Sequence, residues 1–128
     1  GKYVGVFLCL LAIILIANPV TAQRLYKAGY SIDIMWKVQS RKFIIWGDFE
    51  RGKACERIDL DVQFRNYETG QKVGMTTTCR NEHLPGSRSW FRYEKKTDTK
   101  NKRNSWKIDW FQFQCINDGR SENYVWMK

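Results

Sequence analysis

The sequence predicts a small all-β domain, a single antiparallel β-sandwich that follows an N-terminal signal peptide. Residues 56–65 alternate polar and apolar side chains without a break, so Ile58, Leu60, Val62 and Phe64 share one face of a strand. Similar short runs recur along the chain and are separated by turn residues, a spacing typical of all-β sandwiches. Outside the N-terminal segment, no run has the 3.6-residue period of a helix.

The first 22 residues have the pattern of a secretory signal peptide. Lys2 is a short basic start, residues 4–17 are almost wholly apolar, and Val20-Thr21-Ala22 resembles a signal peptidase site. The apolar run is shorter than the roughly 20 residues that a membrane-spanning helix needs. We therefore expect cleavage after Ala22, a domain of residues 23–128, and a secreted or periplasmic location. The alternative is an uncleaved segment that anchors the protein in a membrane.

The domain that remains after this cleavage is strongly basic. Removing Lys2 leaves 21 basic and 13 acidic residues, which is a net charge of +8. A positive surface attracts polyanions such as glycosaminoglycan, lipopolysaccharide, anionic lipid or nucleic acid. The alternative is that the positive charge serves only to keep the domain soluble.

Taken in order, the chain shows six or seven short strands, as in an immunoglobulin-like sandwich. Residues 23–29 are expected to be a lead-in without a strand. Gly70 is expected to adopt a positive φ in the central hairpin, and a change of phase between Trp110 and Phe111 predicts a β-bulge. Strands are expected over residues 31–38, 42–49, 56–65, 73–79, 89–93, 105–116 and 124–126.

Three cysteines follow the predicted cleavage site, which in an oxidising compartment predicts one disulfide and one free thiol. Cys79 and Cys115 each lie on the same strand face as apolar neighbours, so both are expected to point into the core. We therefore expect an inter-sheet Cys79–Cys115 disulfide. The alternative is Cys55–Cys79, which would join the two ends of the central hairpin.

Part of the chain resembles a known family. Ile44-Ile45-Trp46-Gly47-Asp48-Phe49 precedes the alternating strand, and Asn66, Thr69-Gly70-Gln71-Lys72 and Leu84-Pro85-Gly86 follow it. Over residues 42–93 this pattern resembles the FxLYD-type small β-sandwich domains of exported prokaryotic proteins. The resemblance implies an exported accessory or binding domain without catalytic residues. The chain departs from the family's pattern in its three cysteines and at Arg51-Gly52, where the family has an Asn.

The segment of residues 94–104, called here the basic loop, is the best candidate for a binding site. Cationic side chains attract sulfate or phosphate, and aromatic side chains stack on sugar rings or bases. The alternative is a flexible, solvated hairpin loop. Together with its flanks, the predicted binding set is Arg92, Tyr93, Lys95, Lys96, Lys100, Lys102, Arg103, Trp106 and Lys107.

Catalytic chemistry is less well supported. His83, the single histidine, lies beside Glu82 and could serve a small nuclease-like hydrolase with a nearby Arg80 or Arg88, but a solvated loop histidine is the simpler interpretation. Asp59 and Asp61 could form a carboxylate pair, or they could simply be solvated or paired with neighbouring arginines.

No cofactor motif is present, and no metal site is expected because the cysteines are far apart and only one histidine exists. The expected function is therefore a non-catalytic binding domain for a protein partner or an anionic polymer. The rivals are the hydrolase and an assembly subunit that pairs through a sheet edge at residues 124–126.

Overall fold

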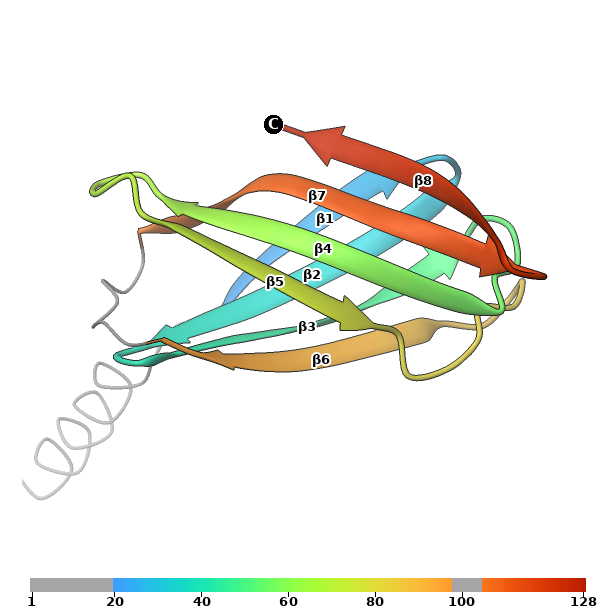
Figure 1. Ribbon diagram of the computed structural model, residues 1–128, viewed down its shortest axis with the longest axis horizontal. Helices are drawn as coiled ribbons and strands as arrows, with labels where there is room; N and C mark the ends of the chain where they lie inside the picture. The colour runs from blue at the N-terminus through green and yellow to red at the C-terminus, as the bar shows by residue number, and fades with distance from the viewer. Residues whose placement is uncertain (1–19, 98–104) are drawn as a thin grey trace, which may run out of the picture.

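The computed structural model describes residues 20–97 and 105–128, and these residues form an all-β domain (Figure 1). The described part of the chain contains no helix of the length and apolarity needed to span a membrane. Its strands are β1 (Thr21–Lys27), β2 (Tyr30–Gln39), β3 (Lys42–Arg51), β4 (Arg57–Asn66), β5 (Lys72–Thr78), β6 (Ser89–Lys96), β7 (Trp106–Asn117) and β8 (Arg120–Met127).

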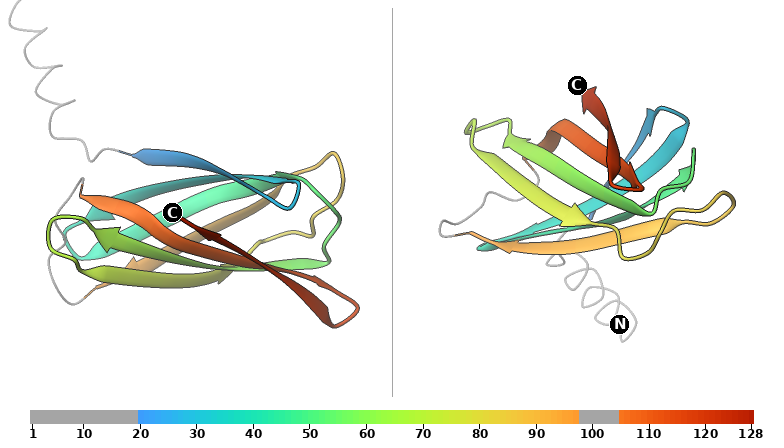
Figure 2. Two further views of the ribbon diagram at one scale, coloured as in Figure 1. Left: turned by 90° about the horizontal axis from the view of Figure 1, so that it is seen from above. Right: turned by 45° about the vertical axis from the view of Figure 1, so that its right-hand side comes forward.

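Within these residues the strands make two antiparallel sheets, confirming the predicted β-sandwich (Figure 2). The first sheet has the order β1-β2-β3-β6, and the second has the order β5-β4-β7-β8. The chain crosses between the sheets after β3, after β5 and after β6. In immunoglobulin domains the second strand lies between the first and the fifth, whereas β2 lies between β1 and β3, so the likeness is one of architecture.

The core lies between the sheets and follows the predicted alternation. Ile58, Leu60, Val62 and Phe64 of β4 are all at most 1% exposed. Aromatic rings from both sheets meet there, because large rings fill the space that a short chain could not fill with aliphatic side chains alone. Buried rings include Trp36, Phe43, Phe49, Phe91, Phe111 and Phe113.

One strand of the structure was not predicted from the sequence. The expected lead-in over residues 23–29 was wrong, because β1 pairs with β2 along its whole length, from Thr21 opposite Trp36 to Lys27 opposite Tyr30. An edge strand needs few apolar side chains, and only Leu25 of β1 is buried, so the period-2 signal is weak there. The expected cleavage point after Ala22 falls inside β1. Residues 1–19 lie outside the described residues, and the signal peptide remains a prediction.

Two local predictions are confirmed. Gly70 has φ +77°, and its N–H donates to the Asn66 carbonyl over 2.8 Å, which closes the β4–β5 hairpin. The register of β4 and β7 shifts at Gln63, which lies opposite Trp110 while the next residue, Phe64, lies opposite Ile108. The bulge turns Phe111 inward and so keeps both halves of the long strand in contact with the core.

The disulfide differs from both predicted pairings: it joins Cys55 to Cys115, with their Cα atoms 5.3 Å apart. Cys79 is a buried free thiol, and burial raises its pKa to about 12. Cys79 and Cys115 do both point inward, but they belong to the same sheet with Ile58 of β4 between them. Two strand spacings of about 4.8 Å separate them, beyond the reach of a disulfide.

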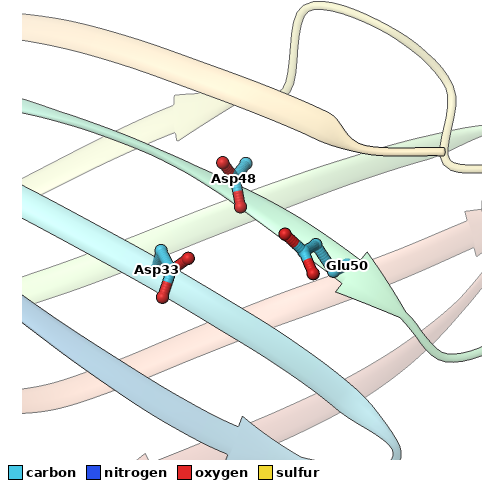
Figure 3. Close-up of side chains that lie close together, drawn as sticks. All are labelled: Asp33, Asp48 and Glu50. Atoms are coloured by element: carbon cyan, nitrogen blue, oxygen red, sulfur yellow. The ribbon is translucent and has the colours of Figure 1, made fainter.

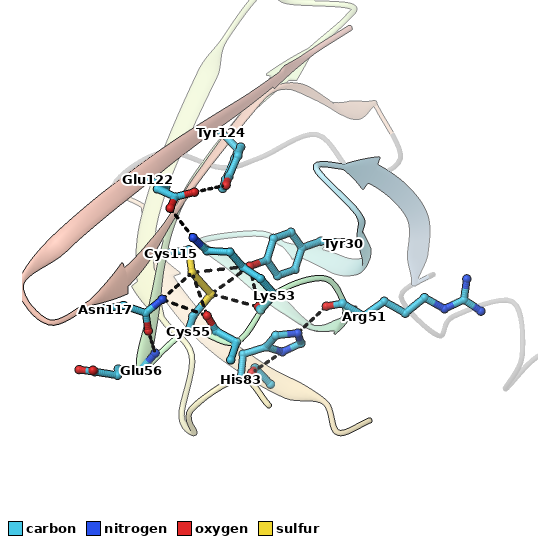
Figure 4. Close-up of a disulfide and its surroundings, with 12 residues drawn as sticks. Tyr30, Arg51, Lys53, Cys55, Glu56, His83, Cys115, Asn117, Glu122 and Tyr124 are labelled. Atoms are coloured by element: carbon cyan, nitrogen blue, oxygen red, sulfur yellow. Dashed lines mark hydrogen bonds and ion pairs between the residues drawn. A yellow bond between two sulfur atoms is a disulfide. The ribbon is translucent and has the colours of Figure 1, made fainter. Parts of the chain in front are cut away.

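The disulfide lies in a buried polar cluster at one end of the sandwich (Figure 4). The Tyr30 hydroxyl donates to the Lys53 carbonyl over 2.8 Å and lies 3.1 Å from the Cys55 sulfur. Burial raises the pKa of Tyr30 to about 12. The backbones of Cys55 and His83 exchange hydrogen bonds of 2.9 and 2.8 Å. These contacts tie the β3–β4 and β5–β6 connections to β7.

Candidate functional site

The β2–β3 and β4–β5 turns lie at the opposite end of the sandwich (Figure 1), and the strands of the second sheet carry basic side chains near this end. On the outer face of the second sheet, Lys72 and Lys107 lie opposite Arg65 on its two sides. All three are exposed and alternate with buried neighbours. Like charges directly opposite one another destabilise a sheet, so this row is retained at a cost in stability.

A hollow of about 140 Å³ adjoins this row and is called here the Tyr67 hollow. The Lys107 ammonium lies 4.9 Å from the centre of the Tyr67 ring, and the ring is 54% exposed. Asp109 lies 3.9 Å from Arg65 and partly balances the charge. The hollow therefore combines an aromatic surface with an excess of positive charge. Its lining residues are Arg65, Tyr67, Lys107, Ile108, Asp109 and Lys128.

The local sequence explains why Tyr67 is held in this position. Asn66, which is fully buried, accepts hydrogen bonds from the backbone N–H groups of Glu68 and Thr69 over 3.0 and 3.1 Å. Such an Asx turn fixes the hairpin from within. The Tyr67 N–H donates to the Ser105 carbonyl over 2.9 Å, so the residue that follows the basic loop is attached directly to the hollow.

The predicted binding set does not form one patch. Lys107 lies at the Tyr67 hollow, but Arg92 and Lys96 lie on the outer face of the first sheet. The Lys95 ammonium donates to the carbonyl of Gly74 on β5, the edge strand of the second sheet, over 2.6 Å. Tyr93 is 36% exposed. The remaining members, Lys100, Lys102 and Arg103, lie outside the described residues.

The charge of Arg92 is partly neutralised by a neighbouring carboxylate. Glu94 lies 2.7 Å from Arg92 and 2.9 Å from Lys42, which is opposite Lys96. Hydrogen bonds from Lys42 and then from Arg92 hold the pKa of the Glu94 carboxyl below its ordinary value. The excess of positive charge is therefore clearest on the second sheet.

Trp106 was wrongly placed among the binding residues. It is only 4% exposed, and its ring packs edge-on against Phe43 with the centroids 5.4 Å apart. The residue begins β7 on the inward parity, so it contributes to the core and cannot stack on a ligand. The exposed ring is supplied by Tyr67, which was not among the predicted binding residues. Its position in the turn between two alternating strands was the available signal.

His83 is neither a solvated loop histidine nor an accessible acid–base group. It is fully buried. Its Nδ1 lies 2.9 Å from the Ser89 hydroxyl, and its Nε2 lies 2.5 Å from the Arg51 carbonyl oxygen (Figure 4). The carbonyl can only accept, so Nε2 carries a proton and donates to it. The side chain thereby links β3, the β5–β6 connection and β6.

Asp59 and Asp61 lie on the outer face of β4 and have neighbours within hydrogen-bond distance. Arg57 and Thr78 donate to Asp59 over 3.1 and 2.8 Å, and Thr76 donates to Asp61 over 2.6 Å. The expected pairing of an arginine with this face is confirmed for Arg57. These contacts account for both carboxylates as surface groups of the sheet.

Three other carboxylates, which sequence reasoning missed, meet on the outer face of the first sheet. One oxygen from each of Asp33, Asp48 and Glu50 lies within 4.8 Å of the others (Figure 3). Arg24 makes two hydrogen bonds to Asp33, of 2.7 and 3.0 Å, and Arg88 lies 2.7 Å from Glu50. Asp33 and Asp48 lie opposite each other on β2 and β3, a pairing that the sequence alone does not reveal.

Comparisons with protein-family models, curated proteins and solved structures found no match to this chain. The resemblance to FxLYD-type domains remains a prediction.

Proposed function

We propose that the chain is an exported, non-catalytic binding domain that takes an anionic polymer at the Tyr67 hollow. The observation that carries this proposal is the row Lys72–Arg65–Lys107, in which three exposed cations lie opposite one another across the second sheet. A bound sulfate or phosphate group would relieve their repulsion. The exposed Tyr67 ring would pack against the adjacent sugar.

The rest of the chain supports this proposal. The net charge of +8 on residues 23–128 would attract a polyanion over a long range. Ser105, the residue that follows the basic loop, accepts a hydrogen bond from the Tyr67 N–H at the hollow. The Cys55–Cys115 disulfide is the kind of bond that persists in an oxidising compartment.

The experiment is heparin chromatography against a salt gradient, with a sulfonate cation exchanger as the reference column. We expect Arg65→Gln/Lys107→Gln to elute from heparin at clearly lower salt than the wild type. The matched control is Lys27→Gln/Arg120→Gln, which removes the same charge from exposed positions at the other end of the sandwich. The control is expected to shift less on heparin, while both variants shift equally on the sulfonate column.

Equal shifts of the two variants on heparin would contradict the proposal, because they would show that net charge alone determines retention. Tyr67→Ala tests the aromatic contribution without changing charge. It is expected to weaken heparin retention and to leave elution from the sulfonate column unchanged.

A further inference from the structure

The first sheet carries a groove on its outer face, the side away from the second sheet. It has a volume of about 540 Å³, within the range of small-molecule sites. Outward-facing side chains of β2, β3 and β6 line it, among them Met35, Trp46, Asp48, Trp90 and Arg92. The proposed polymer site lies on the other sheet, so this outer-face groove requires an explanation of its own.

Two tryptophans form its aromatic surface. Trp46 lies opposite Arg92 and Asp48 lies opposite Trp90. The two tryptophans are therefore diagonal neighbours across β3 and β6, a relation that places Cα atoms about 7–8 Å apart. Trp90 is 49% exposed. The backbone N–H of Trp90 donates to the Asn81 side-chain oxygen over 3.1 Å, and the Arg80 guanidinium lies 5.6 Å from the centre of the indole ring. The first contact fixes the strand at this residue, and the second contacts the ring itself.

Asp48 supplies an unused acceptor in the groove. Its Oδ1 is buried and has no hydrogen-bond partner among the described residues, although buried polar atoms are normally paired. Its neighbours Asp33 and Glu50 are held by Arg24 and Arg88. Asp48, a residue of the groove wall, therefore has an acceptor that the described part of the domain leaves unsatisfied.

The charges around the groove favour an uncharged ligand. A cation would satisfy Asp48 but would meet Lys37 and Arg92 on the groove wall. An anion would be repelled by Asp48 itself. A neutral molecule with hydroxyl groups meets neither penalty, because each hydroxyl can donate to Asp48 or accept from Arg92.

We propose that the outer-face groove binds a neutral saccharide, with sugar rings on Trp46 and Trp90 and a hydroxyl donating to Asp48 Oδ1. The C–H groups on the face of a pyranose ring are apolar and slightly positive, and they pack on the negative face of an indole. Such a ligand satisfies the unpaired acceptor and covers the exposed ring at once.

The test is affinity electrophoresis of the full chain in gels that contain hydroxyethylcellulose, laminarin, neutral arabinoxylan or galactomannan. We expect at least one polysaccharide to retard the protein. Trp90→Ala is expected to abolish the retardation, and Asp48→Asn is expected to weaken binding about tenfold, because the ionised acceptor forms the stronger hydrogen bond. Tyr26→Ala is the matched control, since Tyr26 is 65% exposed and lies outside the groove.

Retardation by no polysaccharide would overturn the proposal, and so would equal losses in Trp90→Ala and Tyr26→Ala. Concentration-dependent dimers that Trp90→Ala dissociates would assign the groove to a second copy of the chain instead. A melting temperature raised by CaCl2 alone, and not in Asp48→Asn, would assign the acceptor to a cation. Arg65→Gln/Lys107→Gln is expected to keep saccharide binding, which separates this site from the proposed polymer site.

Discussion

The backbone carbonyl oxygen of Asp33 lies 1.9 Å from the point that a Cβ atom on Gly47 would occupy. The ring of Phe91 comes within 2.8 Å of the same point. Gly47 lies on the inward face of β3, between β2 and β6. Its missing side chain allows β2 to approach and Phe91 to fill the space, and this packing holds Trp46 and Asp48 in the outer-face groove.

Replacing Gly47 by Ala is therefore expected to destabilise the domain by about 3 kcal/mol or more, because the clash involves backbone that cannot move aside. The control is Gly74→Ala on β5, where an added Cβ meets nothing within 4 Å; its effect is expected within about 0.5 kcal/mol. Urea denaturation measures both. Equal effects would show that the sheet relaxes around Gly47.

Removing the disulfide is expected to cost more than removing the free thiol. Cys55 and Cys115 are 60 residues apart in sequence, and the loop-entropy relation gives an upper value of about 4 kcal/mol for such a crosslink. Cys55→Ala/Cys115→Ala should lower the unfolding free energy by about 2–4 kcal/mol, and Cys79→Ala by about 1 kcal/mol. Peptide mapping that found Cys79 in a disulfide would contradict the structure.

Ionisation of the Asp48 carboxyl is expected to lower the stability of the folded domain as pH rises. Burial, and then the charge of Asp33, raise the pKa of Asp48 above its ordinary value of 3.8. The folded state therefore holds the proton more tightly, and stability falls as pH rises from near 3.8 through the raised folded pKa. Asp48→Asn removes this loss, so we expect a gain in stability at pH 7 and a flatter pH profile in mild acid.

Asp33→Asn is the matched variant, and its effect on stability at pH 7 is expected to have the opposite sign. The hydrogen bond from Arg24 lowers the pKa of Asp33, so its contribution is present above the unfolded pKa and is lost as pH falls through the folded pKa. The substitution should reduce stability at pH 7 and have little effect in strong acid. Urea denaturation between pH 3 and 7 compares the two; the same sign for both at pH 7 would contradict these assignments.

His83→Ala is expected to lower the unfolding free energy by about 2–4 kcal/mol. It opens a buried space and leaves the Arg51 carbonyl and the Ser89 hydroxyl without their partner. Glu82→Ala changes the exposed neighbouring residue and is expected to stay within about 0.5 kcal/mol. Thermal unfolding measures both; a stable His83→Ala protein that had lost a hydrolytic activity would instead favour a catalytic role.

Much of the fold could be predicted because alternation is a local property. The apolar phase of residues 56–65 identified β4 and its buried face, and the change of phase after Trp110 located the bulge. β1 was missed because an edge strand with one buried side chain, Leu25, carries little periodicity. Trp106 was misassigned because an aromatic residue beside a basic loop looks the same in sequence whether its ring points inward or outward.

The sequence by itself determined the fold class, the inward and outward parity of most strands, and the positive charge, since each depends on neighbouring residues or on composition. The tertiary structure decided which strands are neighbours. It placed Cys79 and Cys115 on one sheet with β4 between them, buried His83, aligned Lys72, Arg65 and Lys107, and brought Asp48 beside Trp90. Parity gives the face of one strand, whereas pairing between strands depends on contacts between distant residues that no local pattern records.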